Sequence, residues 1–270
     1  MRITGATRVF TILASPSRHV VAPLIFNRLF ALLGLDMVYI AHDIPAGSLP
    51  GVLQSFRTWR NLGGFNVTIP HKESAAGLLD RLLPPASDLG AVNTVVRGPG
   101  GRLTGYNTDG LGAVRALGDV RGAKCLVIGA GGAARAVVHA LLEAGALRVS
   151  VLNRSPDRTR SLLERFEQAV EVFCPDVLPD MDVVVQATPV TERVPFDLDL
   201  SALKRDTRIL ETVMQETALS REASSRGLHL APGHLMLFHQ TAENFRLLTG
   251  IDAPEEIVSR AFRDAGFVLP

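Results

Sequence analysis

Short apolar runs alternate with longer helical segments along most of the chain. Val9–Leu13 and Val38–Ala41 are compact apolar runs, which is typical of buried strands. Segment 24–33 is expected to form a helix, and segment 45–61 is expected to be mostly helical after a polar start. Because strands and helices alternate, the pattern predicts an α/β fold with parallel strands.

The stretch 64–72, GFNVTIPHK, combines a strand pattern with candidate chemistry. Phe65–Ile69 alternate and carry β-branched residues, so they predict a strand that the following proline ends. A period of two places Asn66 and Thr68 on one face, and the next turn delivers Lys72. Such a layout can hold a hydroxylated molecule beside a proton carrier. It is also compatible with an ordinary strand end and a solvated lysine.

The following segments continue the alternation. A helix is expected over 74–83, where two prolines stop it, and a strand over 91–97. Segment 98–101 is a tight turn into another short strand. Asp109 can cap a helix that runs towards Leu117, and capping alone would be sufficient reason for an aspartate here.

A glycine-rich segment gives the strongest local signal. The apolar run 123–128 is followed directly by GAGGAA and then by a helical pattern. Glycine at 129 permits a tight turn, glycine at 131 lets the backbone approach a pyrophosphate, and a small residue at 134 allows close helix packing. The alternative is a structural strand–helix turn. The candidate dinucleotide-binding residues are Gly129, Ala130, Gly131, Gly132, Ala133 and Ala134.

The end of the next strand, 148–152, bears on the choice of cofactor. An NAD site usually places an acidic side chain at this tip for the ribose 2′-hydroxyl, but this chain has Asn153, Arg154 and Ser155. Arg154, with Arg158 one turn later, could instead bind a 2′-phosphate through charge-assisted hydrogen bonds. We therefore expect NADP rather than NAD, although arginines at the start of a solvated helix are common.

Further strands are expected at 181–187 and 208–214. Thr188 follows the first of them, at the carboxyl ends of the strands where a cofactor binds. A Pro-Gly pair then breaks the pattern, and a helical region follows in which Met236 and Gln240 lie on one face. A structural role would also explain this glutamine. One or two helices complete the chain, and we expect them to pack on the first domain.

Composition narrows the class of protein. The chain has 270 residues, of which 47% are hydrophobic and 20% charged, so it can form one large or two medium globular domains. A net charge of +1 gives no reason to expect binding to nucleic acid or to an anionic membrane. There is neither a signal-peptide pattern nor an apolar run of about 18 residues, so we expect a cytoplasmic protein. Cys125 and Cys174 are expected to be buried thiols, without a disulfide or a metal site.

Taken as a set, the motifs resemble those of the shikimate dehydrogenase family. They span nearly the whole chain and occur in the family's order. The matching motifs are NVTIPHK at 66–72, AVNT at 91–94, GYNTDG at 105–110, GAGGAARA at 129–136, NRS at 153–155, ATP at 187–189, Gly233 with Met236, Leu237 and Gln240, and TG at 249–250.

The resemblance implies a fold and a reaction. It implies an α/β substrate domain, 1–106, completed by the C-terminal helices, 237–270, and a Rossmann-type NADP-binding domain, 107–236. It implies reversible hydride transfer between NADP and a hydroxyl-bearing ring carbon. Lys72 would be the general acid/base, and Asp109 would hold and tune it. The implied substrate ligands are Asn66, Thr68, Asn93 and Gln240, and Gly233 and Met236 join the implied cofactor-binding residues.

One loop departs from the family's pattern. Biosynthetic members carry Ser-x-Ser-Pro after the first strand, and the two serines bind the substrate carboxylate. Aligning on Pro16, His19 and Pro23 places Val20 and Ala22 at the serine positions. Hydrogen bonds to a charged group are worth roughly 1.5–3 kcal/mol each. Their loss without replacement would weaken carboxylate binding by roughly 10²- to 10⁴-fold.

Because of this departure, the motifs do not decide which substrate the protein binds. Arg18 and His19 lie in the same loop and could supply charge or be solvated, and Thr212 aligns with a substrate-side tyrosine of the family. The leading hypothesis is an NADP-dependent oxidoreductase acting on shikimate or a close relative, with quinate, aminoshikimate or another cyclic polyol as alternatives. A ligand-sensing module on this fold is a rival, but retention of Lys72 and Asp109 argues against it. Monomer or homodimer, and a biosynthetic or catabolic role, remain open.

Overall fold

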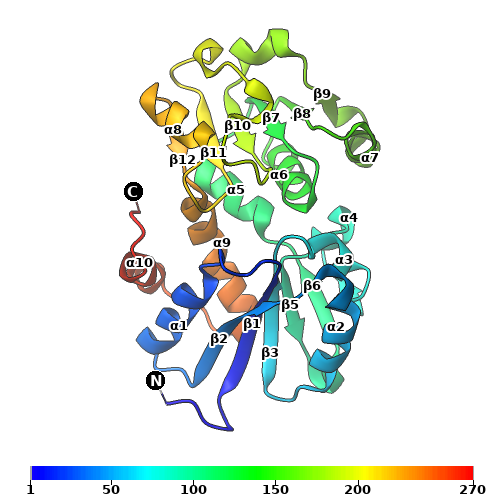
Figure 1. The fold of residues 1–270 in the computed structure, drawn as a ribbon, viewed down its shortest axis with the longest axis vertical. Coiled ribbons are helices and arrows are strands. Elements are labelled where there is room, and N and C mark those ends of the chain that lie inside the picture. The colour runs from blue at the N-terminus through cyan, green and yellow to red at the C-terminus, as the bar shows by residue number, and fades with distance from the viewer. Residues whose placement is uncertain (1, 270) are drawn as a thin grey trace. The chain divides into compact units, whose positions relative to one another are not determined.

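The computed structural model describes residues 2–269 and divides the chain into two compact units (Figure 1). The first unit holds the residues up to Thr108 together with those from Gln240 onward, and the second unit is Asp109–His239. Each unit is built on a six-stranded sheet, as expected for an α/β fold. None of the helices in the described part of the chain is both long and apolar enough to cross a membrane.

The first unit contains a mixed sheet with the strand order β2-β1-β3-β5-β6-β4. β1 pairs in parallel with β2 and β3, whereas β5 is antiparallel to both of its neighbours. The expectation of parallel strands is therefore wrong for β5, because the tight turn at 98–101 returns the chain directly beside the strand it leaves. The strands are β1 Arg8–Ala14, β2 Met37–Asp43, β3 Leu62–Val67, β4 Arg81–Leu82, β5 Thr94–Arg97 and β6 Leu103–Tyr106.

Helices cover both faces of this sheet. Apolar residues of α2, including Leu53 and Phe56, join Leu13 and Phe65 of the strands in one buried cluster. On the other face, Phe10 of β1 packs against α1, its ring centroid 5.7 Å from that of Phe30. The helices of the unit are α1 Ala22–Leu32, η1 Ala46–Ser48, α2 Leu49–Thr58, α3 Lys72–Ala76, α4 Ala86–Leu89, η2 Pro99–Gly101 and α10 Glu255–Asp264, and α9 Gly233–Thr249 contributes its C-terminal part.

The C-terminal helices pack on the N-terminal sheet's helical layer, as expected. The ring of Phe245 in α9 lies 6.2 Å from that of Phe26 and 5.8 Å from that of Phe30, both in α1. Arg28 of α1 pairs with Asp264 of α10 at 2.6 Å. Residues more than two hundred positions apart in sequence thus share one core, because an amphipathic helix must bury its apolar face against some partner.

Two expected elements differ from the observed ones. The helix predicted over 74–83 ends at Ala76, and residues 81–82 form β4 instead. β4 lies beside β6, and the backbone N–H of Leu83 donates to Gly105 O, so sheet pairing overrides the local helical pattern. The strand predicted over 65–69 ends at Val67, because the chain turns there and His71 N–H donates to Thr68 O.

The second unit has a fully parallel sheet with the strand order β12-β11-β10-β7-β8-β9. The chain runs outward from β7 in one direction and then from β10 in the other, so the order reverses between these two strands, where open α/β sheets bind ligands. The strands are β7 Lys124–Ile128, β8 Arg148–Leu152, β9 Val170–Val172, β10 Val183–Gln186, β11 Arg208–Glu211 and β12 His229–Ala231.

The helices of this unit begin with α5, which starts at Asp109 and ends at Leu117 as predicted. Cys125 is fully buried in β7, and burial raises the pKa of its thiol to about 12. Cys174 is exposed, so the expectation of two buried thiols is wrong for this residue. The remaining helices are α6 Gly132–Glu143, α7 Pro156–Phe166, η3 Glu167–Ala169, η4 Pro175–Asp180, η5 Pro195–Asp197, η6 Leu200–Ala202 and α8 Ala218–Ser225.

Candidate functional site

The turn between β7 and α6 has the geometry of a phosphate-binding turn. Gly129 has φ +123°, and a Cβ there would lie 2.8 Å from Ala187 O, so only glycine fits. Gly131 is extended and caps α6, and a Cβ at this position would meet no atom within 4 Å. Ala134 is fully buried, which brings α6 close to the sheet. The turn therefore leaves open space in front of the first N–H groups of α6, and it fits the pyrophosphate of a dinucleotide.

At the end of β8, two polar side chains form hydrogen bonds within the turn and two arginines are exposed. Asn153 Nδ2 donates to Ser155 O at 3.0 Å, and Ser155 Oγ accepts from Arg158 N at 3.4 Å as the N-cap of α7. The side chains of Arg154 and Arg158 are exposed. Asn153 and Ser155 thus shape the turn, while the guanidinium groups of Arg154 and Arg158 are exposed.

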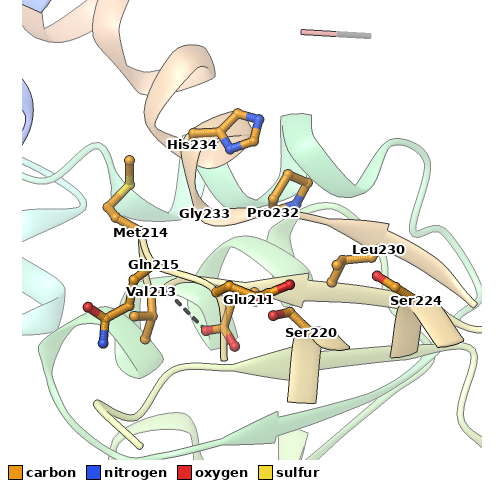
Figure 2. Close-up of a pocket in the computed structure, with 11 residues that line it drawn as sticks. Glu211, Val213, Met214, Gln215, Ser220, Ser224, Leu230, Pro232, Gly233 and His234 are labelled. Atoms are coloured by element: carbon orange, nitrogen blue, oxygen red, sulfur yellow. Dashed lines mark hydrogen bonds between the residues drawn. The ribbon is translucent and has the colours of Figure 1, made fainter. Parts of the chain in front are cut away.

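A cavity of about 260 Å³ opens at the carboxyl ends of β11 and β12 in the second unit (Figure 2). Figure 2 shows Ser220 and Ser224 of α8 on one side and the loop residues Met214 and Gln215 on the other. Gly233 lines the cavity where α9 begins, and a Cβ there would lie 2.3 Å from Val213 O. A glycine is required here because two backbone segments pass in contact.

Glu211 is the buried acid of this cavity and was not identified from the sequence. It is 1% exposed, and its carboxylate accepts from Val213 N at 2.9 Å and from Thr217 Oγ1 at 2.7 Å. Burial raises the pKa of Glu211 to about 7, although these hydrogen bonds act in the opposite direction. Thr217 also forms a capping box with Ser220 at the start of α8. The carboxylate therefore fixes the 212–217 loop, and an acidic residue ending an apolar strand was the available sequence signal.

The remaining predicted cofactor positions lie nearby in the second unit. Thr188 follows β10, and its hydroxyl donates to Oε1 of the fully buried Gln186 at 3.0 Å. Met236 is 5% exposed and belongs to the buried cluster around β7 and α6. Thr212 is half-buried, and its N–H donates to Gln186 O. These contacts place the segments after β10 and β11 beside each other at one edge of the sheet.

Lys72 begins α3 in the first unit. Its backbone carbonyl accepts from Val92 N at 3.0 Å, and the preceding His71 is 1% exposed, with Nε2 3.0 Å from Ile44 O. The backbone on both sides of the lysine is thus anchored, while its side chain is half-buried. Asp109, the predicted partner, is the first residue of α5 in the second unit and is 2% exposed.

A polar cluster within the first unit connects the predicted substrate ligands Asn66, Asn93 and Gln240. Asn66 donates from Nδ2 to Asn93 O at 3.0 Å and to Thr94 Oγ1 at 2.9 Å, and its Oδ1 accepts from the buried Tyr39 hydroxyl at 2.6 Å. Burial raises the pKa of Tyr39 well above its usual value, so the phenol is a neutral donor. Both amide hydrogens of Asn66 are therefore bound by protein atoms.

Asn93 links this cluster to α9. Its Nδ2 donates to Thr108 Oγ1 at 2.8 Å and to Gln240 Oε1 at 3.2 Å, and its Oδ1 accepts from Thr108 N at 3.1 Å. Thr68 lies outside the cluster, half-buried, and no hydrogen bond of its hydroxyl is found among residues 2–269. The structure therefore joins Asn66, Asn93 and Gln240 in one hydrogen-bonded set.

The loop after β1 carries the substitutions at the expected carboxylate-binding positions. Val20 is half-buried and Ala22 is 8% exposed, whereas Arg18 and His19 are exposed. The loop is tied to the end of β2 by the N–H of Ser17, which donates to Oδ2 of the neighbouring Asp43 at 2.6 Å. This hydrogen bond lowers the pKa of Asp43, so an anionic carboxylate lies beside the loop.

Known proteins are similar to this chain over nearly its whole length. Residues 12–95 match the shikimate dehydrogenase substrate binding domain, and residues 112–224 match the shikimate / quinate 5-dehydrogenase family. A shikimate dehydrogenase (NADP(+)) of Rubrobacter xylanophilus is 39% identical over 98% of this chain and 99% of its own length.

Solved structures agree with this match. Shikimate dehydrogenase of Aquifex aeolicus aligns with a TM-score of 0.90 and 32% identity, over 97% of this chain and 100% of that one. Shikimate 5-dehydrogenase of Thermus thermophilus, in complex with NADP(H) and shikimate, aligns with a TM-score of 0.85 and 35% identity, over 96% and 100%. The family and the cofactor expected from the motifs are thereby confirmed. The chain belongs to the shikimate dehydrogenase family of NADP-dependent oxidoreductases, which act on a CH–OH group.

Proposed function

We propose that this enzyme catalyses reversible hydride transfer between NADP(H) and the hydroxyl- or keto-bearing ring carbon of shikimate and 3-dehydroshikimate, or of a close analogue. The observation that carries the proposal is the polar cluster in the unit that also holds Lys72. Asn66, Asn93 and Gln240 are fixed by mutual hydrogen bonds before any ligand binds. A set of short neutral amides with fixed orientation is suited to a polyhydroxylated ring.

The proposed chemistry rests on Lys72 and Asp109. When bound, NADPH supplies the hydride to the carbonyl carbon. In that direction Lys72 stabilises the charge that develops on the oxygen and gives it a proton, and in the reverse direction the neutral amine accepts the hydroxyl proton. We assign to Asp109 the role of holding and tuning the lysine. The anchored backbone at His71 and Lys72 limits movement of the proton carrier.

Binding roles are proposed for the remaining residues. In the substrate site, Thr68, Asn93 and Gln240 contact hydroxyl groups, and Asn66 contributes through Oδ1. We place the functional boundaries at 1–106 with 237–270 and at 107–236. The proposed NADP ligands are Gly129, Ala130, Gly131, Gly132, Ala133, Ala134, Asn153, Arg154, Ser155, Arg158, Thr188, Gly233 and Met236.

The substrate is proposed to be a polyhydroxy cyclic acid. Val20 and Ala22 lack the hydroxyl groups that would grip its carboxylate, and Asp43 adds negative charge beside the same loop. These observations keep quinate, aminoshikimate and other cyclic polyols as alternatives, whereas Arg18 and His19 of the same loop could supply positive charge to a carboxylate. For the quaternary structure we propose a monomer or a homodimer. A non-catalytic sensor of the same metabolite is disfavoured, because such a module needs no proton carrier at Lys72.

Initial rates of cofactor reduction test the proposal. Shikimate and quinate are each assayed with NADP and with NAD at micromolar enzyme, and Lys72→Ala serves as the blank. We expect saturable turnover of shikimate with NADP that Lys72→Ala lowers by at least about 10³-fold, which is within the range of general acid–base contributions. NADPH binding, followed by its fluorescence, should survive in the variant. Turnover that is equal in both proteins would remove Lys72 from the mechanism.

A further inference from the structure

Asn244 lies one helical turn after Gln240 on the same face of α9, and it is 5% exposed. Its Oδ1 accepts two hydrogen bonds, from Thr94 Oγ1 at 2.8 Å and from Thr108 Oγ1 at 2.7 Å. The two threonines belong to different segments of the first unit, at the start of β5 and after β6. One amide oxygen thus joins β5, the 107–108 segment and α9.

The two threonine hydroxyls lie within reach of more acceptors than they have hydrogens. Thr94 Oγ1 is 2.8 Å from Asn244 Oδ1 and 3.0 Å from Asn93 Oδ1. Thr108 Oγ1 is 2.7 Å from Asn244 Oδ1 and 3.3 Å from Gln240 Oε1. A hydroxyl carries one hydrogen, and the usual O–H···O distance is close to 2.7–2.8 Å. Both hydroxyls therefore donate to Asn244.

The direction of these two threonine hydrogen bonds determines which groups of the Gln240 amide can bond to a ligand. Its Oε1 accepts from Asn93 Nδ2 at 3.2 Å, which fixes the orientation of the amide. Because the hydroxyl hydrogen of Thr108 is donated to Asn244 Oδ1, Gln240 Oε1 keeps one acceptor site for a ligand. In the part of the chain from 2 to 269, no hydrogen bond of Gln240 Nε2 is found. The half-buried amide can thus accept from one ligand group and donate to another.

We propose that Asn244 is a positioning and specificity-determining residue, which keeps Gln240 Oε1 open to a hydroxyl of the substrate by taking the hydrogen of Thr108. The assignment rests on the proposed function, in which Gln240 contacts a polyhydroxylated ring. Without the oxygen at 244, the hydrogen of Thr108 turns to Gln240 Oε1 and occupies the acceptor site. The substrate class that this arrangement selects is a ring whose hydroxyl donates to the enzyme.

The test compares Asn244→Leu with Asn244→Asp. The leucine removes the acceptor, whereas the aspartate keeps an oxygen at the same place. We expect Asn244→Leu to raise the KM for shikimate about tenfold, which corresponds to one neutral hydrogen bond of about 1.4 kcal/mol, with kcat changed less than about twofold. Asn244→Asp should restore most of the affinity. Asn61→Leu, an asparagine of the same unit that donates to Thr7 O, is the matched control.

Monodeoxy analogues of shikimate separate this role from a structural one. In the wild type, the analogue that lacks the hydroxyl bound by Gln240 should lose about tenfold in kcat/KM. In Asn244→Leu, loss of the same substrate hydroxyl should not lower kcat/KM further, because the hydroxyl of Thr108 already occupies the acceptor site on Gln240 Oε1. Equal penalties in both proteins would overturn the assignment. Thermal unfolding and NADPH binding check that each variant is folded, and Asn244→Ala carries the same test if the leucine variant does not fold.

The outcomes distinguish the two proposals. If the wild type turns over shikimate and the KM of Asn244→Leu is unchanged, the role of Asn244 is refuted and the proposed function stands. If the wild type turns over neither shikimate nor quinate, the proposed function is refuted, and the assignment of Gln240 and Asn244 to this substrate is refuted with it.

Discussion

Replacing Glu211 by glutamine should remove a pH-dependent loss of stability from this enzyme. Burial raises the pKa of the Glu211 carboxyl from 4.5 to about 7. Below pH 4.5 the group is protonated in both the folded and the unfolded chain. Between these two values it is protonated in the folded protein alone, so the stability that protonation supplies is lost as the pH rises through the folded pKa.

The magnitude follows from the two pKa values. At 1.36 kcal/mol for each pH unit, the difference between 4.5 and about 7 corresponds to about 3 kcal/mol of folding free energy. The glutamine side chain stays neutral, and it can still accept from Val213 N and bond to Thr217. The free energy of unfolding of Glu211→Gln, relative to wild type, should therefore increase by about 3 kcal/mol between pH 4.5 and pH 8.

Thermal unfolding from pH 4.5 to pH 8 measures this difference. For a chain of this size, about 3 kcal/mol corresponds to roughly 6–12 °C in Tm. Glu216→Gln is the matched control, because Glu216 lines the same cavity but is exposed. Its profile should follow that of the wild type within about 0.5 kcal/mol. Parallel profiles for wild type and Glu211→Gln would refute the conclusion that burial of this carboxyl dominates its ionisation.

Three further predictions concern cofactor and substrate. Gly131→Val should fold, because a Cβ there meets no atom within 4 Å. It should weaken NADPH binding at least about tenfold by filling the phosphate space, and normal binding in a fluorescence titration would contradict this. Arg154→Ala with Arg158→Ala should lower the preference for NADP over NAD about 10- to 100-fold in kcat/KM, since two exposed charge-assisted contacts are lost, and an unchanged ratio would exclude them from 2′-phosphate binding. Val20→Ser with Ala22→Ser should lower the KM for shikimate, and a flat response would mean that the carboxylate is held elsewhere.

The sequence alone predicted the fold class and the dinucleotide-binding turn. These features depend on local rules: the tight turn between a strand and a helix requires a glycine, and Gly129 there adopts φ +123°. The start of α5 at Asp109 was predicted for the same reason, because helix starts have local signals. The family was likewise predicted from the motifs alone, because their residue types and their order along the chain are properties of the sequence.

Predictions from the sequence were wrong where long-range pairing decides the structure. Residues 81–82 have a helical pattern, yet they pair with β6 through hydrogen bonds that no local rule reveals. β5 runs antiparallel to β3 for a similar reason, since this pairing joins residues such as Asn66 and Thr94 that are far apart in the sequence. Cys174 was expected to be buried, but its exposure depends on what the rest of the unit leaves uncovered.

Most of the elements, the family and the chemical groups of the site could be predicted from the sequence, because these follow from side-chain type and short-range spacing. How those groups share their hydrogens depends on the folded chain. Asn244 and Thr108 are 136 positions apart, yet they bond at 2.7 Å, and this is the contact that we propose keeps Gln240 Oε1 open to the substrate. The buried carboxylate of Glu211 likewise acquires its raised pKa from the surrounding fold. Solvation and hydrogen-bond competition depend on distance in space, which sequence spacing does not specify.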